Sequence, residues 1–569
     1  MYIRTTTNRQ GQAYYHLVES YRENGKVRQR KLLSLGRVGE DRLDELITAI
    51  GKHKDVISTL EAAKSVDIDD TYILGPLLIL QHIFAQFGIP ALLDNIMHKH
   101  PQLKFNFTRI IFTLIACRFV NPSSKLKVFE HWQDKLYPEL LSGKDELHHF
   151  YRALDLLSRH KDDIERALYW HKRDLCNMSV DVVLYDLTTL RFESTREDIG
   201  ELKRFGYSKE NRSDCTQVIL GLLVDVDGIP LGFEVYPGNA FEGHTLVDIV
   251  TKMREKFKVR RFIFVADRGL FSADNLKHIR MNCGRSANEK GEFIVGMKLG
   301  VFKNRHDEFY DHSRFTSIND HFEIYETTHG EDRLIITWSQ SRADRDRKTR
   351  EDILEKIEKK LKSPKIDVKT FVSNTNYRKY VTGLNKGAPQ LNKGAISREA
   401  LRDGFFGVIT NVPKEKMSAN EIVTAYKHLW IIEDAFGEIK GTLKTRPIFH
   451  WTDKRIIGHL TLCFIAYFCE AQITKLLRLQ HIKYESHAVD NGTIEPRPLT
   501  VSSAMLELKE VRAIPVNLQG RIAWVRTDIK GNAAKIFKAM GIAIPPKLLK
   551  LSSKNPSVQN TANVVPQTV

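Results

Sequence analysis

Three carboxylates that lie far apart in the chain are the residues best suited to chemistry. Asp186 and Asp267 each end an apolar, β-type run, and Glu433 lies later in a helical pattern. Strand-end carboxylates can meet at one edge of a sheet, where three of them would repel one another unless cations lay between them. Their hard oxygens suit Mg²⁺ or Mn²⁺. Two such ions about 4 Å apart activate a water or a 3′-hydroxyl for phosphodiester displacement.

The segment 423–440, which holds Glu433, is expected to form one long helix. Ser418 can cap its N-terminus, and Glu421, three residues later, completes a capping box. At about 100° per residue, one stripe roughly 80° wide holds Tyr426, Trp430, Glu433 and Lys440. The stripe lies on or beside an apolar face. A buried aromatic stripe with a Glu and a Lys at its edge remains an equally open interpretation.

The elements that must position the two aspartates lie between residues 180 and 300. Expected strands are 180–186, 217–226, 231–235, 261–267 and 293–298, with helices at 245–257 and from an N-cap at Ser272 to Ile279. Residues 300–400 interrupt this unit with short strands at 322–327 and 333–339 and a charged helix at 342–361. A strand at 404–410 then resumes it. The pattern predicts a multidomain α/β protein whose mixed-sheet core is split by a β-rich insertion.

The segments that flank this core differ in character. An Asn24-Gly25 turn between extended runs predicts a basic β-hairpin, able to contact DNA or to be a plain solvated hairpin. The region that follows, to about residue 175, shows helical periodicity. It could be a helical domain that grips DNA ends, or a plain helical scaffold. We expect these divisions: hairpin 1–60, helical domain 61–175, core 176–300, insertion 301–400, core with the Glu helix 401–480, helical region 481–551 and disordered tail 552–569.

The composition indicates which class of partner the protein binds. The chain has 87 basic and 70 acidic residues, a net charge of +17, which favours nucleic acid over basicity kept for solubility alone. Its six cysteines include no Cys-x-x-Cys pair, which argues against a disulfide framework or a zinc ribbon. We see no signal peptide and no bilayer span in the sequence. The expectation is a soluble cytoplasmic protein with no membrane partner.

Four blocks carry a resemblance to a known family. They are Tyr185-Asp-Leu-Thr-Thr, Ala266-Asp-Arg-Gly-Leu-Phe, Asp403-Gly-Phe-Phe-Gly-Val-Ile-Thr-Asn and Tyr426-x3-Trp-x2-Glu-x2-Phe-x3-Lys440. The sequence resembles the DDE transposases of bacterial insertion sequences, closest to the branch named after insertion sequence 4. This resemblance implies an RNase H-like core, two divalent ions on Asp186, Asp267 and Glu433, and cleavage and joining of DNA at element ends. Leu429 occupies the position where the family motif has Arg.

Further residues are candidates for DNA contact. Lys440 and Arg268 are expected to hold phosphates, and Trp430 either stacks on a displaced base or packs in the core. The candidate set is Tyr426, Trp430, Lys440, Arg268, Arg28 and Arg30. The expected partners are double-stranded DNA, as terminal inverted repeats and target, and a second copy of the chain on that DNA, in the bacterial nucleoid. The alternatives are a catalytically silent DNA-binding remnant and a nuclease that cuts without joining.

Overall fold

The computed structural model describes most of the 569 residues. Not described are residues 1, 9, 24–25, 38–69, 142, 144, 172–180, 198–199, 208–211, 213, 258–261, 271–272, 283–290, 303–304, 363–367, 384–388, 484–497, 519–520 and 552–569. The chain divides into two compact units. One comprises Met1–Gly75, Lys509–Lys530 and Ala543–Val569, and the other Pro76–Leu508 and Gly531–Ile542.

The first unit holds two small antiparallel sheets. The N-terminal sheet has the order β1 (Tyr2–Thr7), β2 (Ala13–Glu23), β3 (Lys26–Gly36). The predicted hairpin is confirmed as β2 and β3, although its Asn24-Gly25 turn lies outside the described residues, and β1 was not predicted. The other sheet has the order β18 (Leu548–Leu551), β17 (Arg521–Arg526), β16 (Arg512–Leu518), β4 (Tyr72–Ile73). The predicted tail 552–569 also lies outside the described residues.

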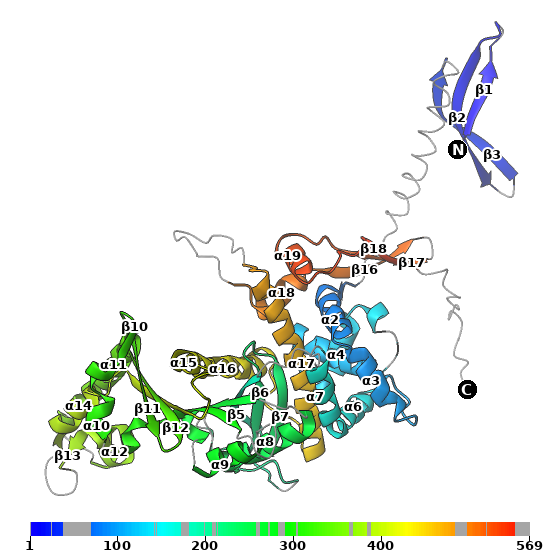
Figure 1. The fold of residues 1–569 in the computed structure, drawn as a ribbon. Helices are drawn as coiled ribbons and strands as arrows, with labels where there is room; N and C mark the ends of the chain where they lie inside the picture. The colour runs from blue at the N-terminus through cyan, green and yellow to red at the C-terminus, as the bar shows by residue number, and fades with distance from the viewer. Residues whose placement is uncertain are drawn as a thin grey trace. The chain divides into compact units, whose positions relative to one another are not determined.

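The second unit is built on a nine-stranded mixed sheet (Figure 1), with β5–β8 and β8–β9 parallel and the other pairs antiparallel. Its strand order is β10 (Thr316–Asn319), β11 (Phe322–His329), β12 (Asp332–Ser339), β15 (Phe405–Thr410), β9 (Glu292–Met297), β8 (Phe262–Ala266), β5 (Asp181–Arg191), β6 (Gln217–Val224), β7 (Pro230–Pro237). The expected mixed-sheet core is present, with β5 the third strand from its β7 edge.

The expected β-rich insertion differs from the structure. Strands β10, β11 and β12 do not form a separate unit, because β12 pairs with β15 and so extends the core sheet. Leu334 and Ile336 on β12 are buried, which gives this strand a face that can join the core. The segment between β12 and β15 is mainly helical. It comprises α11 (Gln340–Leu361), α12 (Val368–Ser373), α13 (Thr375–Tyr380), β13 (Val381–Thr382), β14 (Gln390–Leu391) and α14 (Lys393–Ala400).

The two faces of the central sheet are covered by different helices. Val183, Tyr185 and Leu187 of β5 share one buried cluster with side chains of α8 (Glu242–Phe257) and α9 (Ala273–Asn282). Because side chains alternate along a strand, Leu184, Asp186 and Thr188 point to the opposite face. There, α15 (Ala419–Lys427) packs on β8 and β9, and α16 (Leu429–Gly437) packs on β5 and β6.

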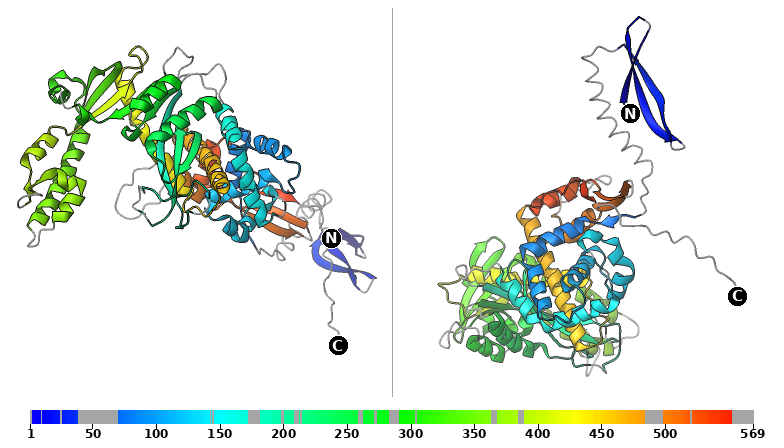
Figure 2. Two further views of the ribbon diagram at one scale, coloured as in Figure 1. Left: turned by 90° about the horizontal axis from the view of Figure 1, so that it is seen from below. Right: turned by 90° about the vertical axis from the view of Figure 1, so that its right-hand side faces the viewer.

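A helical layer adjoins β7 and is visible from further sides in Figure 2. Its long helix α17 (Asp453–Leu479) is apolar enough to span a membrane by length and composition, but 89% of its most apolar stretch is buried inside the protein. The other helices are α2 (Gly75–Gln86), α3 (Ile89–His98), α4 (Phe107–Val120), α5 (Lys125–Lys127), α6 (Leu147–Arg159), α7 (Lys161–Trp170), α18 (Val501–Leu508) and α19 (Gly531–Ala539). A further short helix, α10 (His306–Phe309), precedes β10.

The crossing of α17 and α6 depends on Gly458. A Cβ at this position would lie 2.0 Å from the carbonyl oxygen of Leu154, which is backbone and cannot move aside cheaply. We expect Gly458→Ala to lower the free energy of unfolding by about 1–3 kcal/mol, as overpacking does. Gly437→Ala is the matched control, because no atom lies within 4 Å of a Cβ there. It should stabilise the helix by about 0.5–1 kcal/mol. Urea unfolding of both variants checks the prediction, and equal effects would contradict it.

Candidate active site

The parallel pairing of β5 and β8 brings two of the three predicted carboxylates side by side. The register aligns Leu184 with Val265 and Tyr185 with Ala266, so the next residues in line are Asp186 and Asp267. Both side chains point to the sheet face opposite α8 and α9. Asp267 is exposed and Asp186 is partly buried. Two carboxylates 81 residues apart in the chain thus become neighbours through strand pairing alone.

Asp186 was expected at the end of its strand, and this was wrong. Strand β5 continues to Arg191, because beyond Asp186 it still pairs with β6. What ends at this position is the parallel pairing with β8, whose last partners are Tyr185 and Ala266. Asp186 therefore lies where the sheet opens on one side. Continued pairing with β6 holds its backbone on the other side.

The predicted single helix over 423–440 is interrupted. Its start is confirmed, with Ser418 as N-cap and Glu421 closing a capping box. However, α15 ends at Lys427, α16 begins at Leu429, and a π-helical turn, Glu438–Thr442, follows. His428 at the junction has helical backbone angles, but the amide of Ile431 bonds to its carbonyl across a tight three-residue turn. The uniform 100° rotation assumed for the sequence fails here, so the predicted stripe does not remain on one face.

Tyr426 contacts the site directly. Its hydroxyl donates a hydrogen bond to Oδ1 of Asp267 at 2.9 Å. The ring fits because β9 has Gly296 below it, where a Cβ would lie 2.4 Å from that hydroxyl. Phe406 of β15 packs beside it, with ring centroids 5.0 Å apart. Burial and the charge of Asp267 raise the pKa of Tyr426, so the hydroxyl stays protonated and donates.

A second cation, absent from the sequence prediction, lies beside Tyr426. Arg342, in the first turn of α11, places its guanidinium carbon 4.7 Å from the ring centroid of Phe406. Its Nε is buried without a hydrogen-bond partner, and the nearest carboxylate, that of Asp346, is 3.8 Å away. Burial, with the charges of Arg345 and Arg268, lowers its pKa. No sequence signal distinguishes Arg342 from its neighbours, because α11 carries many charges and no motif.

Glu433 is exposed on α16 and lines a cavity of about 370 Å³ between α16, α17 and the β6–β7 turn. Other acidic residues line it too: Asp227, Asp434, Glu438 and Glu470. Among the described residues, one group of three possible metal ligands has its ligand atoms within 4.8 Å of one another, and it is Asp162, Glu165 and Glu234. Those three pair with Lys161 and Lys256 and form an ion-pair network. In the structure, Asp186, Asp267 and Glu433 do not form so close a group.

The other candidate residues are spread over several elements. Trp430 on α16 is 48% exposed, so the interpretation of it as a core residue is wrong. Lys440 is partly buried within the π-helical turn, and Arg268 is exposed just after Asp267. Arg28 and Arg30 lie on β3 of the other unit, where Arg30 pairs with Glu19 at 2.6 Å. Arg268 thus directly follows Asp267 in the chain, and Arg342 lies over the Phe406 ring that packs beside Tyr426.

The family model described as "Transposase DDE domain" matches residues 177–469, slightly more than half of the chain. The chain belongs to the DDE transposase family. A second model, "IS1634 family transposase, N-terminal domain", matches residues 3–62. The transposase is therefore of the insertion-sequence kind. Its N-terminal match is to the IS1634 family and not to the branch named after insertion sequence 4.

Other comparisons add little. No curated protein matches the transposase. A solved structure described as "Cryo-EM structure of piggyBac transposase synaptic complex with hairpin DNA" matches with 10% identity and a TM-score of 0.35. That match covers 77% of this chain and 80% of the other.

The hydrogen bond from Tyr426 to Asp267 predicts that the affinity for divalent ions depends on the Tyr426 hydroxyl. Tyr426→Phe removes the donor but keeps the ring, so Asp267 loses the group that orients it. From the expectation that Asp267 binds a divalent ion, the concentration of Mn²⁺ that half-saturates DNA cleavage should rise about 10- to 100-fold, the usual effect when a metal-binding carboxylate loses its hydrogen-bond partner. Tyr325→Phe is the control, since its hydroxyl donates to Glu308 at 2.8 Å at another place in the same sheet. An unchanged half-saturating concentration in Tyr426→Phe would show that Tyr426 does not orient Asp267 for binding a divalent ion.

Glu470 in the acidic cavity predicts that the free energy of unfolding depends on pH. Burial, and then the charge of Glu438, raise the pKa of Glu470 from 4.5 to about 7. In the unfolded chain this carboxyl ionises near pH 4.5, so the folded state binds the extra proton between pH 4.5 and about 7. The stability it contributes is full below pH 4.5 and is lost as pH rises through 7.

Glu470→Gln removes the ionisable group and keeps an acceptor for the Thr474 hydroxyl, which lies 2.8 Å from the carboxylate. At pH 8 we expect the variant to be more stable than the wild type by up to about 3 kcal/mol, and at pH 4.5 the difference should vanish. Urea unfolding at the two pH values measures it, with exposed Asp434→Asn as control. A gain that is the same at both pH values would show that the titration of Glu470 is not its cause.

Proposed function

We propose that this DDE transposase cleaves and joins DNA at the sheet edge that holds Asp186 and Asp267, with Glu433 as the third acidic residue. The observation that carries the proposal is the in-register placement of the two aspartates on neighbouring parallel strands, beneath the helices that contain Tyr426 and Glu433. Tyr426 already bonds to one of the two carboxylates. The acidic residues of the site thus come from the strand and helix positions that the family resemblance implies.

The topology supports an RNase H-like core. Strands β5, β6 and β7 form an antiparallel meander, and β8 and β9 then add parallel strands on the other side of β5. The resulting order, β7-β6-β5-β8-β9, places the first strand of the core in the middle. Asp186 lies on β5, and Asp267 directly follows β8. The remaining strands extend this five-stranded core at its β9 edge.

The donor set of the site fits divalent cations. Asp186 and Asp267 offer hard carboxylate oxygens on one face, and one oxygen of Asp267 is oriented by Tyr426. We propose that Asp186, Asp267 and Glu433 together hold two Mg²⁺ or Mn²⁺ ions. Such ions, when bound, activate the attacking oxygen and stabilise the leaving oxygen of a phosphodiester.

The other residues act on the DNA. Arg268 follows Asp267 directly and is exposed, so we propose that it holds a backbone phosphate next to the reacting one. Arg342 supplies a second positive charge beside Tyr426. Leu429, at the position where the family motif has Arg, carries no charge. Lys440 and Trp430 are proposed to contact the same strand, Trp430 through its exposed ring. These residues bind and orient DNA without reading its bases.

The partner is double-stranded DNA carrying the terminal repeats of the element, gripped in part by the basic sheet β1–β3 with Arg28 and Arg30. Both arginines are on the exposed strand β3. Assembly of two copies on DNA, an association with the nucleoid and membership of the branch named after insertion sequence 4 remain predictions from the resemblance. The match of residues 3–62 favours the IS1634 family for the N-terminal part.

Substituting the acidic residues tests the assignment. We expect Asp186→Asn, Asp267→Asn and Glu433→Gln to leave the affinity for labelled element ends unchanged and to reduce cleavage by at least about a hundredfold, more than outer-shell changes do. Asp434→Asn is the matched control for Glu433→Gln, since it neutralises the next carboxylate on the same helix.

Gel analysis of labelled ends with Mg²⁺ separates the possible outcomes. Cut and joined products support a transposase, cut products alone a nuclease, and binding without cutting a silent remnant. Wild-type cleavage rates in any of the three acidic variants would refute the site assignment.

A further inference from the structure

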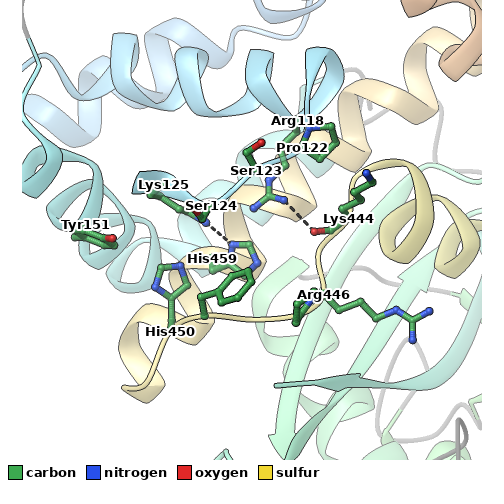
Figure 3. A pocket seen from close by; sticks show the side chains of 12 residues that line it. Arg118, Pro122, Ser123, Ser124, Lys125, Tyr151, Lys444, Arg446, His450 and His459 are labelled. Carbon is green, nitrogen blue, oxygen red and sulfur yellow. Dashed lines mark hydrogen bonds between the residues drawn. The ribbon is translucent and has the colours of Figure 1, made fainter. Parts of the chain in front are cut away.

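A cavity of about 160 Å³ lies in the second unit where the loop 443–452 meets α4, α5, α6 and the start of α17 (Figure 3). The loop follows the π-helical turn that holds Lys440. Six of its 12 lining residues are basic or imidazole side chains: Arg118, Lys125, Lys444, Arg446, His450 and His459. None of the lining residues has a carboxylate. The space exceeds that of several water molecules and is sufficient for a tetrahedral oxyanion.

Two of the cations are almost completely buried. Arg118 is 6% exposed and Lys125 is 4% exposed. The guanidinium of Arg118 donates to the carbonyl oxygens of Leu443 and Lys444 at 3.1 and 3.0 Å. The ammonium of Lys125 lies 2.7 Å from Nδ1 of His459. These partners are neutral, whereas buried cations are normally paired with an anion, because removing a charge from water is costly.

The two histidines respond to this excess of positive charge. Burial, with the charges of Lys125 and Arg118, lowers the pKa of His450 to about 2 and the pKa of His459 well below its usual value. Arg455 on α17 also acts on His450. Burial lowers the pKa of Lys125 as well, helped by Arg118. At neutral pH both imidazoles are therefore neutral, and an anion placed among these groups would favour protonation.

The surroundings of the cavity are those of a nucleic-acid contact. On the same loop Phe449 is 61% exposed and Trp451 is 47% exposed. The guanidinium of Arg196 and the ammonium of Lys203 lie 5.5 and 5.6 Å from the ring centroid of Trp451. Exposed aromatic rings beside cations are the elements that bind unpaired bases and their backbone. A site for a free inorganic anion would not require them.

The loop is also fixed to the strand that carries Asp186. The amide of Ile448 donates to the carbonyl of Arg191 at 3.1 Å, and Phe192 forms a parallel bridge with Ile448. Arg191 is the last residue of β5, five positions beyond Asp186. The backbone of β5 therefore links the loop to Asp186 over five residues.

We propose that the cavity formed by Arg118, Lys125, Lys444 and His450 binds a backbone phosphate of the DNA substrate, with the adjacent base stacked on Phe449 or Trp451. The proposal rests on the proposed function and adds a second anchoring point to it. The phosphate supplies the negative charge that the buried cations lack. It holds the strand at a fixed distance from Asp186 without taking part in the reaction.

Lys125→Met tests the proposal, because methionine keeps the unbranched chain and removes a buried charge that has no carboxylate partner. We expect the affinity for end DNA to fall about tenfold uniformly across sequences, and the slope of log K against log salt to decrease in magnitude by about 1. The melting temperature should not fall. Lys359→Met is the control, since Lys359 is 73% exposed on α11 and pairs with Glu355. A folded Lys125→Met protein with wild-type affinity and salt slope would overturn the proposal.

Sulfate, a tetrahedral dianion, tests the wild-type transposase without any substitution. Calorimetric titration at pH 7 in buffers of different ionisation enthalpy should show net proton uptake, because the anion raises the pKa of Lys125, His450 and His459. End DNA should compete with the sulfate. Sulfate binding that DNA does not affect would assign the cavity to a free anion instead, and no sulfate binding would also overturn the proposal. The outcome is independent of the acidic variants, which change cleavage and not this binding.

Discussion

The pairing of β5 with β8 is the interaction on which the site depends. Two like charges become neighbours because Tyr185 pairs with Ala266, so that the residues after them share a face. A shift of one residue in this register would turn one aspartate to the opposite face, toward the buried cluster of α8 and α9. The hydrophobic side chains of that cluster, among them Phe262 and Phe264, therefore also keep the carboxylates in position. Packing on one side of the sheet determines chemistry on the other.

The helices over this face connect the acidic edge with the rest of the molecule. Tyr426 holds Asp267 from above, and the chain then continues through α16 and the π-helical turn to the loop 443–452. That loop returns to the end of β5 at Arg191 and Ile448. One segment of fewer than 40 residues thus touches the carboxylates, the acidic cavity and the basic cavity. The two cavities carry opposite charge, which separates a side suited to cations from one suited to phosphate.

Local patterns in the sequence predicted much of this arrangement. The apolar runs of β5 and β8 and the capping box at Ser418 depend mainly on neighbouring residues, and all are present. The membership of β12 in the core sheet depends on its pairing with β15, a contact between distant segments that a period-2 pattern does not specify. The break at His428 has no glycine or proline to mark it, and the helices on either side of it pack on different strands, α15 on β8 and β9 and α16 on β5 and β6. The bond between Tyr426 and Asp267 likewise requires the space above Gly296.

The mainly helical segment between β12 and β15 is joined to the sheet in a way that allows it to vary between related proteins. The amide of Ser339 donates to the carbonyl of Gly404 at 3.1 Å, so the segment leaves and re-enters the sheet at adjacent points. Its own small core, with Phe371 and Tyr380, is complete without the sheet. Evolution can therefore lengthen, shorten or exchange the outer part of this segment without moving the strands below it. The first turn of α11 is the exception, because Arg342 there lies over Phe406 and constrains what any replacement must keep.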